Sequence, residues 1–464
     1  MAKRLRSRLS QKTKASVKVR TSIKIVVGLA SFAVVIAAGW LVYLNFGPQQ
    51  NGKSNEIKYL SDYAWRRELT INPEFIKEPK GLFQFPVFVE LQDVDFKTTK
   101  NGGKIMHPKA WDVCVTQSDG LTKIPIQIDY FDANEGKVGV WLLIDSLYPT
   151  KPKNFFVYYS KPDISTNPFI YAWPKEYGLV SHFQTDAHSK SRISSKAQQS
   201  GGRFEMGKLG NALSINSGSN GDKVQFELNN DFILQQDFTV QLWFQTEKKG
   251  IDQTLVSNFE NQSGIELKIN NYNKLDWKIG LTSGNVVSKL NSKSGEEIEI
   301  GRWYHTALVF EASSKKITLF VDGLIEFQTI LKEMPAIQTK GITVGNSDAQ
   351  ANAGFVGKID ELQIVAKALS NMSVSSLFTN QVNAQLFSRL GKAEELNLSA
   401  EVRAANKQVM YKQAVSDSAQ WSREQKGDEV FAKSNETLKP ISSSAQIMQE
   451  KLKNLQRVAK ENTK

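Results

Sequence analysis

The chain has 464 residues, more than one hydrophobic core usually serves, so two or three domains are expected. Its composition, 40% apolar and 23% charged, is that of a globular protein and excludes a collagen-like or wholly disordered chain. The single cysteine, Cys114, excludes an internal disulfide framework and any multi-cysteine metal centre.

The net charge of +12 is concentrated at the N-terminus. Residues 1–24 contain no acidic side chain and these basic ones: Lys3, Arg4, Arg6, Arg8, Lys12, Lys14, Lys18, Arg20 and Lys24. The rest of the chain is nearly neutral, so no nucleic-acid-binding core and no nucleic-acid partner are expected.

A membrane-spanning helix is predicted over residues 25–46, which carry no charge. At 1.5 Å per residue this helix would be about 33 Å long, enough to cross a hydrocarbon core of about 30 Å. Trp40 and Tyr43 lie near its far end, where aromatic rings favour the interface. The side chains expected to contact membrane lipid are Ile25, Val26, Val27, Leu29, Phe32, Val34, Val35, Ile36, Trp40, Leu41, Val42, Tyr43 and Leu44.

The basic segment 1–24 is expected to stay in the cytoplasm, because moving so many cations across a bilayer is costly. The chain beyond the linker 47–58 would then lie on the opposite side of the membrane. A cleaved signal peptide, cut near Ala37, Ala38 and Gly39, is the competing interpretation, and a buried soluble helix is a third. The apolar run is longer than the 7–15 residues of a signal core, which favours an anchor.

Residues 59–162 contain runs typical of strands, separated by turns such as Asn101-Gly102-Gly103. Helical periodicity is absent. The run Leu82–Leu91 includes Pro86, which cannot donate a backbone hydrogen bond and therefore indicates an edge strand or a bulge. We expect an antiparallel β-sandwich here, followed by a linker at 163–176.

Residues 177–380 continue the all-β character in a second unit. Alternation places Phe238, Val240, Leu242 and Phe244 on one face of a strand, which predicts a buried face. Asp322-Gly323 supplies the turn of a predicted hairpin. Two stacked sheets in a jelly roll would bury such faces.

The last segment, 381–464, is rich in Gln, Ser, Ala, Lys and Glu and is expected to be helical or disordered. An apolar helical face is formed by Ile447, Met448, Leu452, Leu455 and Val458. The predicted fold class is therefore mainly β: two consecutive antiparallel β-sandwiches between an N-terminal transmembrane helix and this tail.

The second unit resembles the laminin-G-like, concanavalin-A-like jelly roll through an ordered series of motifs. These are Gly178–Phe183, Lys208–Ile215, Asp237–Phe244, Arg302–Phe310, Ile317–Gly323, Ile342–Asn346, Phe355–Ile364 and Ala368–Ser370. The resemblance implies a domain at 177–380 of a kind found in secreted and surface proteins, among them sugar binders and β-glucan hydrolases.

The first unit resembles a bacterial family of unknown function, DUF2341. The matching segments are Tyr63–Ile71, Phe85–Val87, Val140–Leu142 and Phe156–Tyr159. That family occurs in bacterial envelope proteins, sometimes beside proton-channel subunits of the MotA/TolQ/ExbB kind. The resemblance implies a location more than a mechanism.

No catalytic motif is found in the sequence. Hydrolases of the jelly-roll architecture carry a Glu-x-Asp-x-x-Glu strand that aims two carboxylates into one cleft, and this pattern is absent. The acidic cluster Glu296, Glu297 and Glu299 fits a solvated loop entering a strand. No nucleophile elbow, phosphate-binding glycine loop or HExxH helix is found either. We therefore expect a protein that is not an enzyme, with a glycoside hydrolase as the least favoured alternative.

The isolated reactive side chains are expected to be structural. His182 and His188 flank Asp186 at a spacing that matches no helical metal site, and His305 is expected to pack with its ring satisfied. Cys114 is expected to be a small buried hydrophobe. Arg66 and Arg67 would bind phosphate or an acidic sugar on one interpretation, and would be solvated beside a core-edge Trp on the favoured one.

No cofactor is required by these patterns, and Ca²⁺ is the metal considered. Relatives of the jelly roll hold calcium at the rim through Asp, Asn and backbone oxygens, as a hard cation requires. Asp222, Asn346 and Asp348 lie in turn-like segments that would suit such a site, although capping turns is the simpler role for them. Asp360-Glu361, in the closing motif, is expected to stabilise the fold.

The sequence as a whole predicts a single-pass protein of the bacterial inner membrane, with a cytoplasmic N-terminus and the bulk of the chain in the periplasm. Its modules would recognise a glycan, a peptidoglycan strand or a partner protein. The alternative is an accessory subunit of an envelope complex that includes proton-channel subunits.

Overall fold

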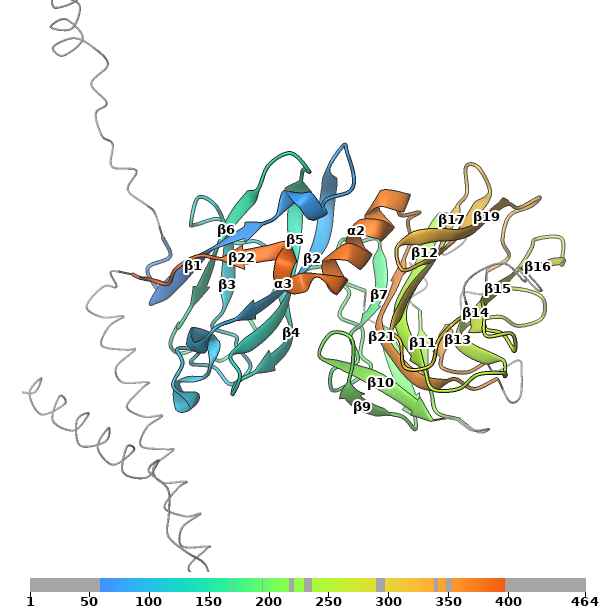
Figure 1. The fold of residues 1–464 in the computed structure, drawn as a ribbon, viewed down its shortest axis with the longest axis horizontal. Helices are drawn as coiled ribbons and strands as arrows, with labels where there is room; N and C mark the ends of the chain where they lie inside the picture. Colours follow the sequence, from blue (N-terminus) through green and yellow to red (C-terminus); the bar gives the residue numbers. More distant parts are fainter. Residues whose placement is uncertain are drawn as a thin grey trace, which may run out of the picture. The chain divides into compact units, whose positions relative to one another are not determined.

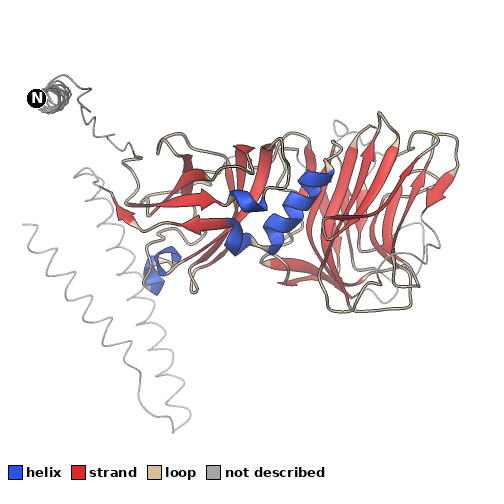
Figure 2. Ribbon diagram, turned by 45° about the horizontal axis from the view of Figure 1, so that its top comes forward, coloured by secondary structure: helices blue, strands red, loops and turns tan. Residues whose placement is uncertain are grey.

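The computed structural model describes residues 59–396, apart from 170, 194, 217–220, 229–235, 289–296, 338–340 and 348–352. The predicted basic segment, the predicted membrane span at 25–46 and most of the predicted tail lie outside these residues. Within the described part of the chain, no helix is both long and apolar enough to cross a membrane. Strands and short helices alone make up its regular structure, which confirms the mainly-β prediction (Figures 1 and 2).

The first sandwich consists of two antiparallel sheets. Its five-stranded sheet contains β1 (Trp65–Ile71), β3 (Cys114–Gln117), β6 (Lys153–Tyr159), β22 (Ser388–Leu390) and β23 (Glu394–Glu395). Its three-stranded sheet contains β2 (Leu82–Gln92), β5 (Lys137–Leu147) and β4 (Ile126–Asp132), in that order. Short 3-10 helices lie at η1 (Pro73–Phe75), η2 (Val94–Phe96) and η3 (Thr99–Asn101).

Apolar side chains from both sheets fill the core of this sandwich, among them Leu69, Val89, Val140 and Phe155. These residues alternate along their strands with residues of the opposite face, as half-buried strands require. Pro86 lies in β2, which is an edge strand of its sheet. The prediction from its missing N–H is confirmed.

The second sandwich is larger and is also antiparallel. Its eight-stranded sheet contains β7 (Tyr177–Ser181), β9 (Arg203–Met206), β10 (Asn211–Asn216), β12 (Phe238–Thr246), β17 (Tyr304–Glu311), β18 (Lys316–Val321), β19 (Leu324–Ile330) and β21 (Val356–Val365). Its seven-stranded sheet contains β8 (Lys196–Ser200), β11 (Lys223–Glu227), β13 (Gln253–Ser257), β14 (Ile265–Ile269), β15 (Leu275–Gly280), β16 (Val286–Ser288) and β20 (Ile342–Val344).

The alternation of β12 is confirmed, because Phe238, Val240, Leu242 and Phe244 all lie in the core between these two sheets. The predicted hairpin is present too. Asp322 has φ 48° and Gly323 has φ 72°, the two positive values that a tight hairpin between β18 and β19 requires.

The outer face of the eight-stranded sheet is covered rather than solvated. Helix α2 (Asn371–Val382) begins after Ser370, whose side-chain oxygen accepts a hydrogen bond from the N–H of Ser373. Trp243, on the outer face of β12, donates a hydrogen bond from Nε1 to Gln381 of this helix. Leu377 of the helix is buried among residues of the first sandwich, so α2 packs against both.

The chain then returns to the first sandwich through α3 (Ala384–Phe387). Strands β22 and β23 both pair with β1, and the N–H of Leu396 donates to the carbonyl of Ala64 at 2.9 Å. The composition of residues 381–464 predicts a tail that includes these strands. The structure instead makes them part of the first sandwich, because their backbone groups complete the edge of its sheet.

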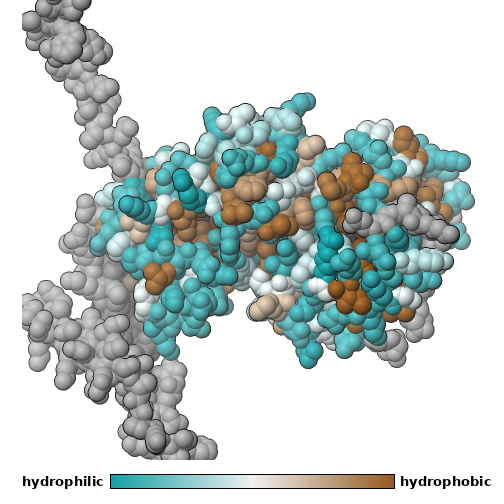
Figure 3. Space-filling view, viewed as in Figure 1, coloured by the Kyte–Doolittle hydropathy of each residue, from teal (hydrophilic) through white to brown (hydrophobic). Residues whose placement is uncertain are grey.

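The surface carries no large apolar face in the view of Figure 3, which shows small hydrophobic patches separated by hydrophilic atoms. Single exposed apolar residues, such as Met206, are ordinary on a protein surface.

Candidate functional site

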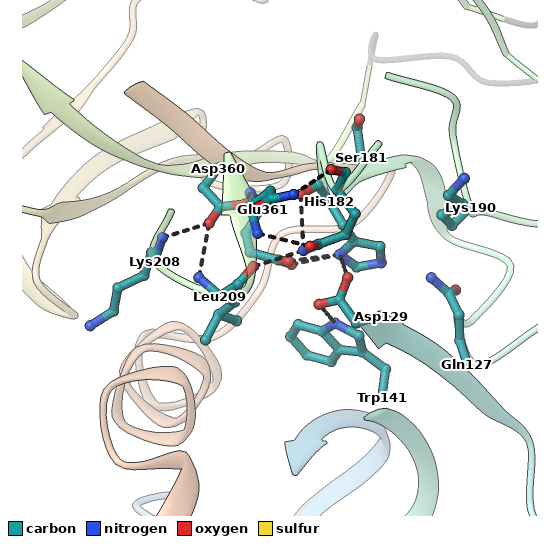
Figure 4. Close-up of polar contacts among 12 residues, drawn as sticks. Gln127, Asp129, Trp141, Ser181, His182, Lys190, Lys208, Leu209, Asp360 and Glu361 are labelled. Atoms are coloured by element: carbon teal, nitrogen blue, oxygen red, sulfur yellow. Dashed lines mark hydrogen bonds and ion pairs between the residues drawn. The ribbon is translucent and has the colours of Figure 1, made fainter. Parts of the chain in front are cut away.

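Three titratable side chains meet in a buried cluster that joins the two sandwiches (Figure 4). Asp129 comes from β4 of the first sandwich, His182 follows β7, and Glu361 lies in β21 of the second. One potential metal-ligand atom from each lies within 4.8 Å of the others. The three side chains are at most 2% exposed, so solvent does not reach them.

A β-bulge positions Asp129. The pairing of β4 with β5 shifts between Ile128 and Tyr130, so that Asp129 is the additional residue. A bulge of this kind turns one side chain away from the regular alternation. Gly139 of β5 makes room for the adjacent Tyr130 ring, since a Cβ there would lie 2.4 Å from a ring carbon.

A second bulge positions Glu361. The pairing of β21 with β12 shifts at this level, and Glu361 has φ 51°, a left-handed conformation that costs about 1–3 kcal/mol outside glycine. On its other side β21 pairs with β10 up to Ile359 and with β7 from Leu362. Glu361 therefore lies between the end of the pairing with β10 and the start of the pairing with β7, and neither strand pairs with it.

His182 comes directly after the last residue of β7 and before Phe183, whose φ is also positive at 54°. Its Nδ1 lies 2.8 Å and 2.9 Å from the two carboxylate oxygens of Glu361, and 3.8 Å from Oδ1 of Asp129. The indoles of Trp141 and Trp173 pack against the imidazole, with ring centroids 5.8 Å and 5.7 Å away.

Two polar atoms of the cluster lack a hydrogen-bond partner among the described residues: Oδ1 of Asp129 and Nε2 of His182. The other oxygen of Asp129 accepts a hydrogen bond from Nε1 of Trp141 at 3.3 Å. The neighbouring Asp360 is satisfied by contrast, because its carboxylate accepts from the N–H groups of Lys208 and Leu209, both at 2.9 Å.

Burial dominates the electrostatics of the cluster. It raises the pKa of Asp129 to about 8; His182 opposes this effect and Glu361 adds to it. Burial likewise raises the pKa of Glu361 and of Asp360, and lowers the pKa of His182. Each group is thus held in an environment that disfavours its charged form.

This arrangement does not suit hydrolysis of a polysaccharide. A glycosidase needs two carboxyl groups on either side of a substrate in an open cleft. Asp129 and Glu361 are close enough to each other, but both are enclosed by protein. The cluster can hold protons or a small cation, and it ties the two sandwiches together.

Sequence reasoning did not bring these three residues together, because they are far apart in the chain. His182 and Glu361 are separated by 179 positions, and both lie in motifs of the laminin-G-like series. For His182 and Glu361, the one feature of the sequence that indicates a special role is a titratable residue inside a largely apolar motif. Nothing in the sequence around Asp129 marks a bulge.

The predicted histidine pair does not converge. His188 is 70% exposed and lies 3.4 Å from Asp186, while His182 points into the buried cluster. His305 is buried between Trp243 and Phe378, as expected. Its ring is not satisfied, however, because Nδ1 has no partner among the described residues.

The predicted calcium ligands are described in part. The carboxylate of Asp222 accepts from the N–H of Asn216 at 3.1 Å, and Oδ1 of Asn346 accepts from the N–H of Ser347 at 2.8 Å. These are turn-capping contacts. Asp348 lies outside the described residues, so the calcium site stays a prediction.

The arginines of the first sandwich are not solvated, contrary to expectation. Arg66 is 1% exposed and forms a two-point ion pair with Glu394, at 2.7 Å and 3.1 Å. Arg67 pairs with Asp93 at 2.7 Å and with Asp95 at 3.2 Å. Because carboxylates already occupy both guanidinium groups, neither is free to bind phosphate. Cys114 is buried, as expected of a small hydrophobe.

Comparison with known families assigns part of the chain. Residues 217–375 match the sequence model of Laminin_G_3, the concanavalin A-like lectin/glucanases superfamily. This confirms the laminin-G-like jelly roll. The match covers about a third of the chain, and it does not extend to the first sandwich.

Individual relatives are more distant. Paraclostridial mosquitocidal protein 1 of Paraclostridium bifermentans is 22% identical over 206 residues, which are 39% of this chain but only 15% of that protein. The binding domain of the same protein has a solved structure, with 17% identity and a TM-score of 0.39, covering 44% of this chain and 52% of that one. The botulinum neurotoxin serotype D binding domain gives 18% identity and a TM-score of 0.37, covering 45% and 53%.

Proposed function

We propose that the protein is a non-catalytic recognition protein of the bacterial cell envelope, whose jelly roll binds a glycan or a partner protein. The match of residues 217–375 to a superfamily of lectins and glucanases is the observation that carries the proposal. The glucanase alternative is the weaker one, because the paired carboxylates Asp129 and Glu361 are enclosed. Residues 25–46 would anchor the sandwiches on the periplasmic side of the inner membrane.

Tyr272 is the contact we propose for a sugar ring. It is 64% exposed, the highest exposure of any aromatic residue in the described part of the jelly roll, and lies in the turn between β14 and β15. Oδ1 of Asn270 accepts from the N–H groups of Tyr272 and Lys274, and Asp252 accepts from that of Asn271. The turn is therefore fixed before binding, which lowers the entropic cost of stacking a sugar on the ring.

A glycan array probed with the full-length protein in detergent tests this proposal. We expect binding to a defined set of glycans, reduced at least tenfold by Tyr272→Ala. The matched control is Tyr171→Ala, which removes another exposed tyrosine that lies before the jelly roll. Binding that survives Tyr272→Ala would place the contact elsewhere, and no glycan binding at all would leave protein recognition as the function.

An accessory role in an envelope complex is the second candidate, and the position of Leu396 favours it. Leu396 is buried beside Tyr63, Tyr158 and Cys114, with Tyr59 packed against the same group. Tyr59 and Leu396, the first and last described residues, thus lie in the same cluster. Tyr59 follows the proposed membrane anchor in the chain, so a tail that starts beside Tyr59 would start near the membrane. Such a tail could contact neighbouring membrane proteins, such as proton-channel subunits.

Deleting residues 397–464 separates the two candidates, because the deletion preserves β22 and β23. We expect the shortened protein to keep its glycan binding. Affinity purification from membranes would then show whether defined partner chains are lost with the tail, as the accessory role requires. Equal recovery of partners with and without the tail would contradict that role.

A further inference from the structure

We propose that Asp129, His182 and Glu361 bind a structural divalent transition-metal ion, with Zn²⁺ the expected occupant, that fastens the first sandwich to the second. An imidazole nitrogen and two carboxylates form a donor set that suits zinc and its neighbours in the first transition row. The donors are Oδ1 of Asp129, Nδ1 of His182 and the carboxylate of Glu361, which together supply three of the four ligands of a tetrahedral ion.

The distances suit this occupant. Zinc–nitrogen and zinc–oxygen bonds of about 2.0–2.2 Å place tetrahedral ligand atoms about 3.3–3.5 Å apart. Nδ1 of His182 lies 2.8 Å and 2.9 Å from the oxygens of Glu361 and 3.8 Å from Oδ1 of Asp129. The ligand atoms of Asp129 and Glu361 lie within 4.8 Å of each other, so shifts of about 1 Å or less would bring all three side chains onto one ion.

A second observation, separate from the grouping of the three side chains, also indicates a bound cation: one buried oxygen has no hydrogen-bond partner. Oδ1 of Asp129 belongs to a fully buried side chain, faces His182 and has no hydrogen-bond partner among the described residues. The second oxygen of Asp129 is held by Nε1 of Trp141, an outer contact of the kind that orients a metal ligand. A buried acceptor oriented in this way and left open is suited to a cation.

The charges balance with a divalent ion. Two carboxylates and a neutral imidazole carry a charge of −2, which M²⁺ cancels at the three ligands. The buried carboxyl of Asp360 adjoins Glu361, accepts hydrogen bonds from two backbone N–H groups and lies outside this count. In Figure 4 the amino groups of Lys190 and Lys208 point away from the three side chains, so neither supplies the missing positive charge.

The backbone is also shaped for this meeting of side chains. Asp129 lies on a bulge, Glu361 lies on a bulge with φ 51°, and Phe183, next to His182, has φ 54°. Three local departures from regular strand geometry direct three side chains to one point, and such departures are concentrated at sites where they serve a purpose. Because solvent does not reach the ligands, the ion would be structural rather than catalytic.

Metal analysis of the full-length protein tests the proposal. The purified protein is stripped with a chelator, dialysed against ZnCl₂ and then against metal-free buffer, and its zinc content is measured by plasma mass spectrometry. We expect about one tightly held ion per chain, and a rise in the unfolding temperature when zinc is restored. The variants His182→Gln and Glu361→Gln should hold less than about a tenth of that amount.

Two matched variants control for the loss of a buried histidine or carboxylate elsewhere. His305→Gln and Asp112→Asn alter residues that are equally buried and lie outside the cluster, and both should retain the ion. If the cluster variants fail to fold, replacement of zinc by Co²⁺ in the unaltered protein keeps the test decisive, because ligand-field absorption bands report tetrahedral coordination directly. Zinc retained equally by His182→Gln, or no zinc and no cobalt bands in the unaltered protein, would overturn the proposal in favour of a proton-sharing cluster.

Discussion

The guanidinium of Arg66 is buried but remains charged, because Glu394 meets it with two oxygens and Tyr158 accepts from its Nη1 at 3.2 Å. The sequence around Arg66 indicated a solvated residue. Its partner lies 328 positions away, in a segment whose composition predicted a tail. A long-range ion pair of this kind leaves no local pattern, so the role of Arg66 was not predictable.

Glu394→Gln should destabilise the fold by about 1–2 kcal/mol. The substitution leaves a buried guanidinium without its counter-charge, but Glu394 is 49% exposed and solvent therefore moderates the loss. Glu395→Gln, at the next position, should change the stability by less than about 0.5 kcal/mol. Urea unfolding measures both, and equal effects would show that the pair contributes nothing.

His305 should make the protein less stable as the pH falls. Burial lowers the pKa of His305 to about 3, whereas an unfolded chain titrates near 6.5. Between these values the unfolded state binds a proton that the folded state does not. The contribution of His305 to the free energy of unfolding is thus fully present above about pH 6.5. It falls by up to about 1.4 kcal/mol per pH unit on acidification toward pH 3.

The comparison with His305→Gln isolates this effect, because other groups titrate equally in both proteins. Buried Asp112, whose pKa is raised to about 6, works in the opposite direction and cancels from the difference. Denaturant unfolding at pH 5, 6 and 7.5 provides the measurement. A difference in stability that does not depend on pH would mean that His305 has the same pKa in the folded protein as in the unfolded chain.

At the scale of elements, α2 protects an edge strand. Asn380 is fully buried in the helix, and its side chain bonds both backbone groups of Phe88 in β2, accepting from the N–H and donating to the carbonyl, each at 2.8 Å. Edge strands expose unpaired backbone groups that favour aggregation. A single amide side chain here takes the place of a neighbouring strand.

Asn380→Ala should cost about 2–4 kcal/mol, because it leaves a buried donor and a buried acceptor without partners. Asn383→Ala, near the end of the same helix, removes a partly exposed contact to the carbonyl of Thr379 and should cost about 1 kcal/mol or less. Thermal unfolding and light scattering on heating measure both effects. Equal costs for the two variants would contradict the role given to Asn380.

Strand alternation and turn residues predicted most of the regular structure, including the buried face of β12 and the hairpin at Asp322-Gly323. They failed where the backbone departs from regularity. The bulges at Asp129 and Glu361 are set by packing between elements, and no property of the individual residues predicts them. The buried cluster is therefore a property of the tertiary structure and cannot be predicted from local sequence patterns.

At the scale of the whole described molecule, one hydrophobic cluster continues through both sandwiches. It contains core residues of the first, such as Val140, together with Val309 and Phe320 from the outer face of the second and Leu377 of α2. A shared core of this kind couples the unfolding of its parts.

The two sandwiches should accordingly unfold in a single transition. Calorimetry of the full-length protein tests this expectation by comparing the calorimetric with the van't Hoff enthalpy, and Leu377→Ala should lower the midpoint without splitting the peak. Two separate transitions would show that the sandwiches are independent domains joined by a weak contact.

Recognition without catalysis is the function proposed for this chain. Incubation of the full-length protein with the polysaccharides that it retains, followed by measurement of released reducing ends, tests that assignment most directly. We predict retention that depends on Tyr272 and no release above the level of buffer alone. Release of reducing ends that disappears in Asp129→Asn or Glu361→Gln would contradict the account and identify the protein as a hydrolase.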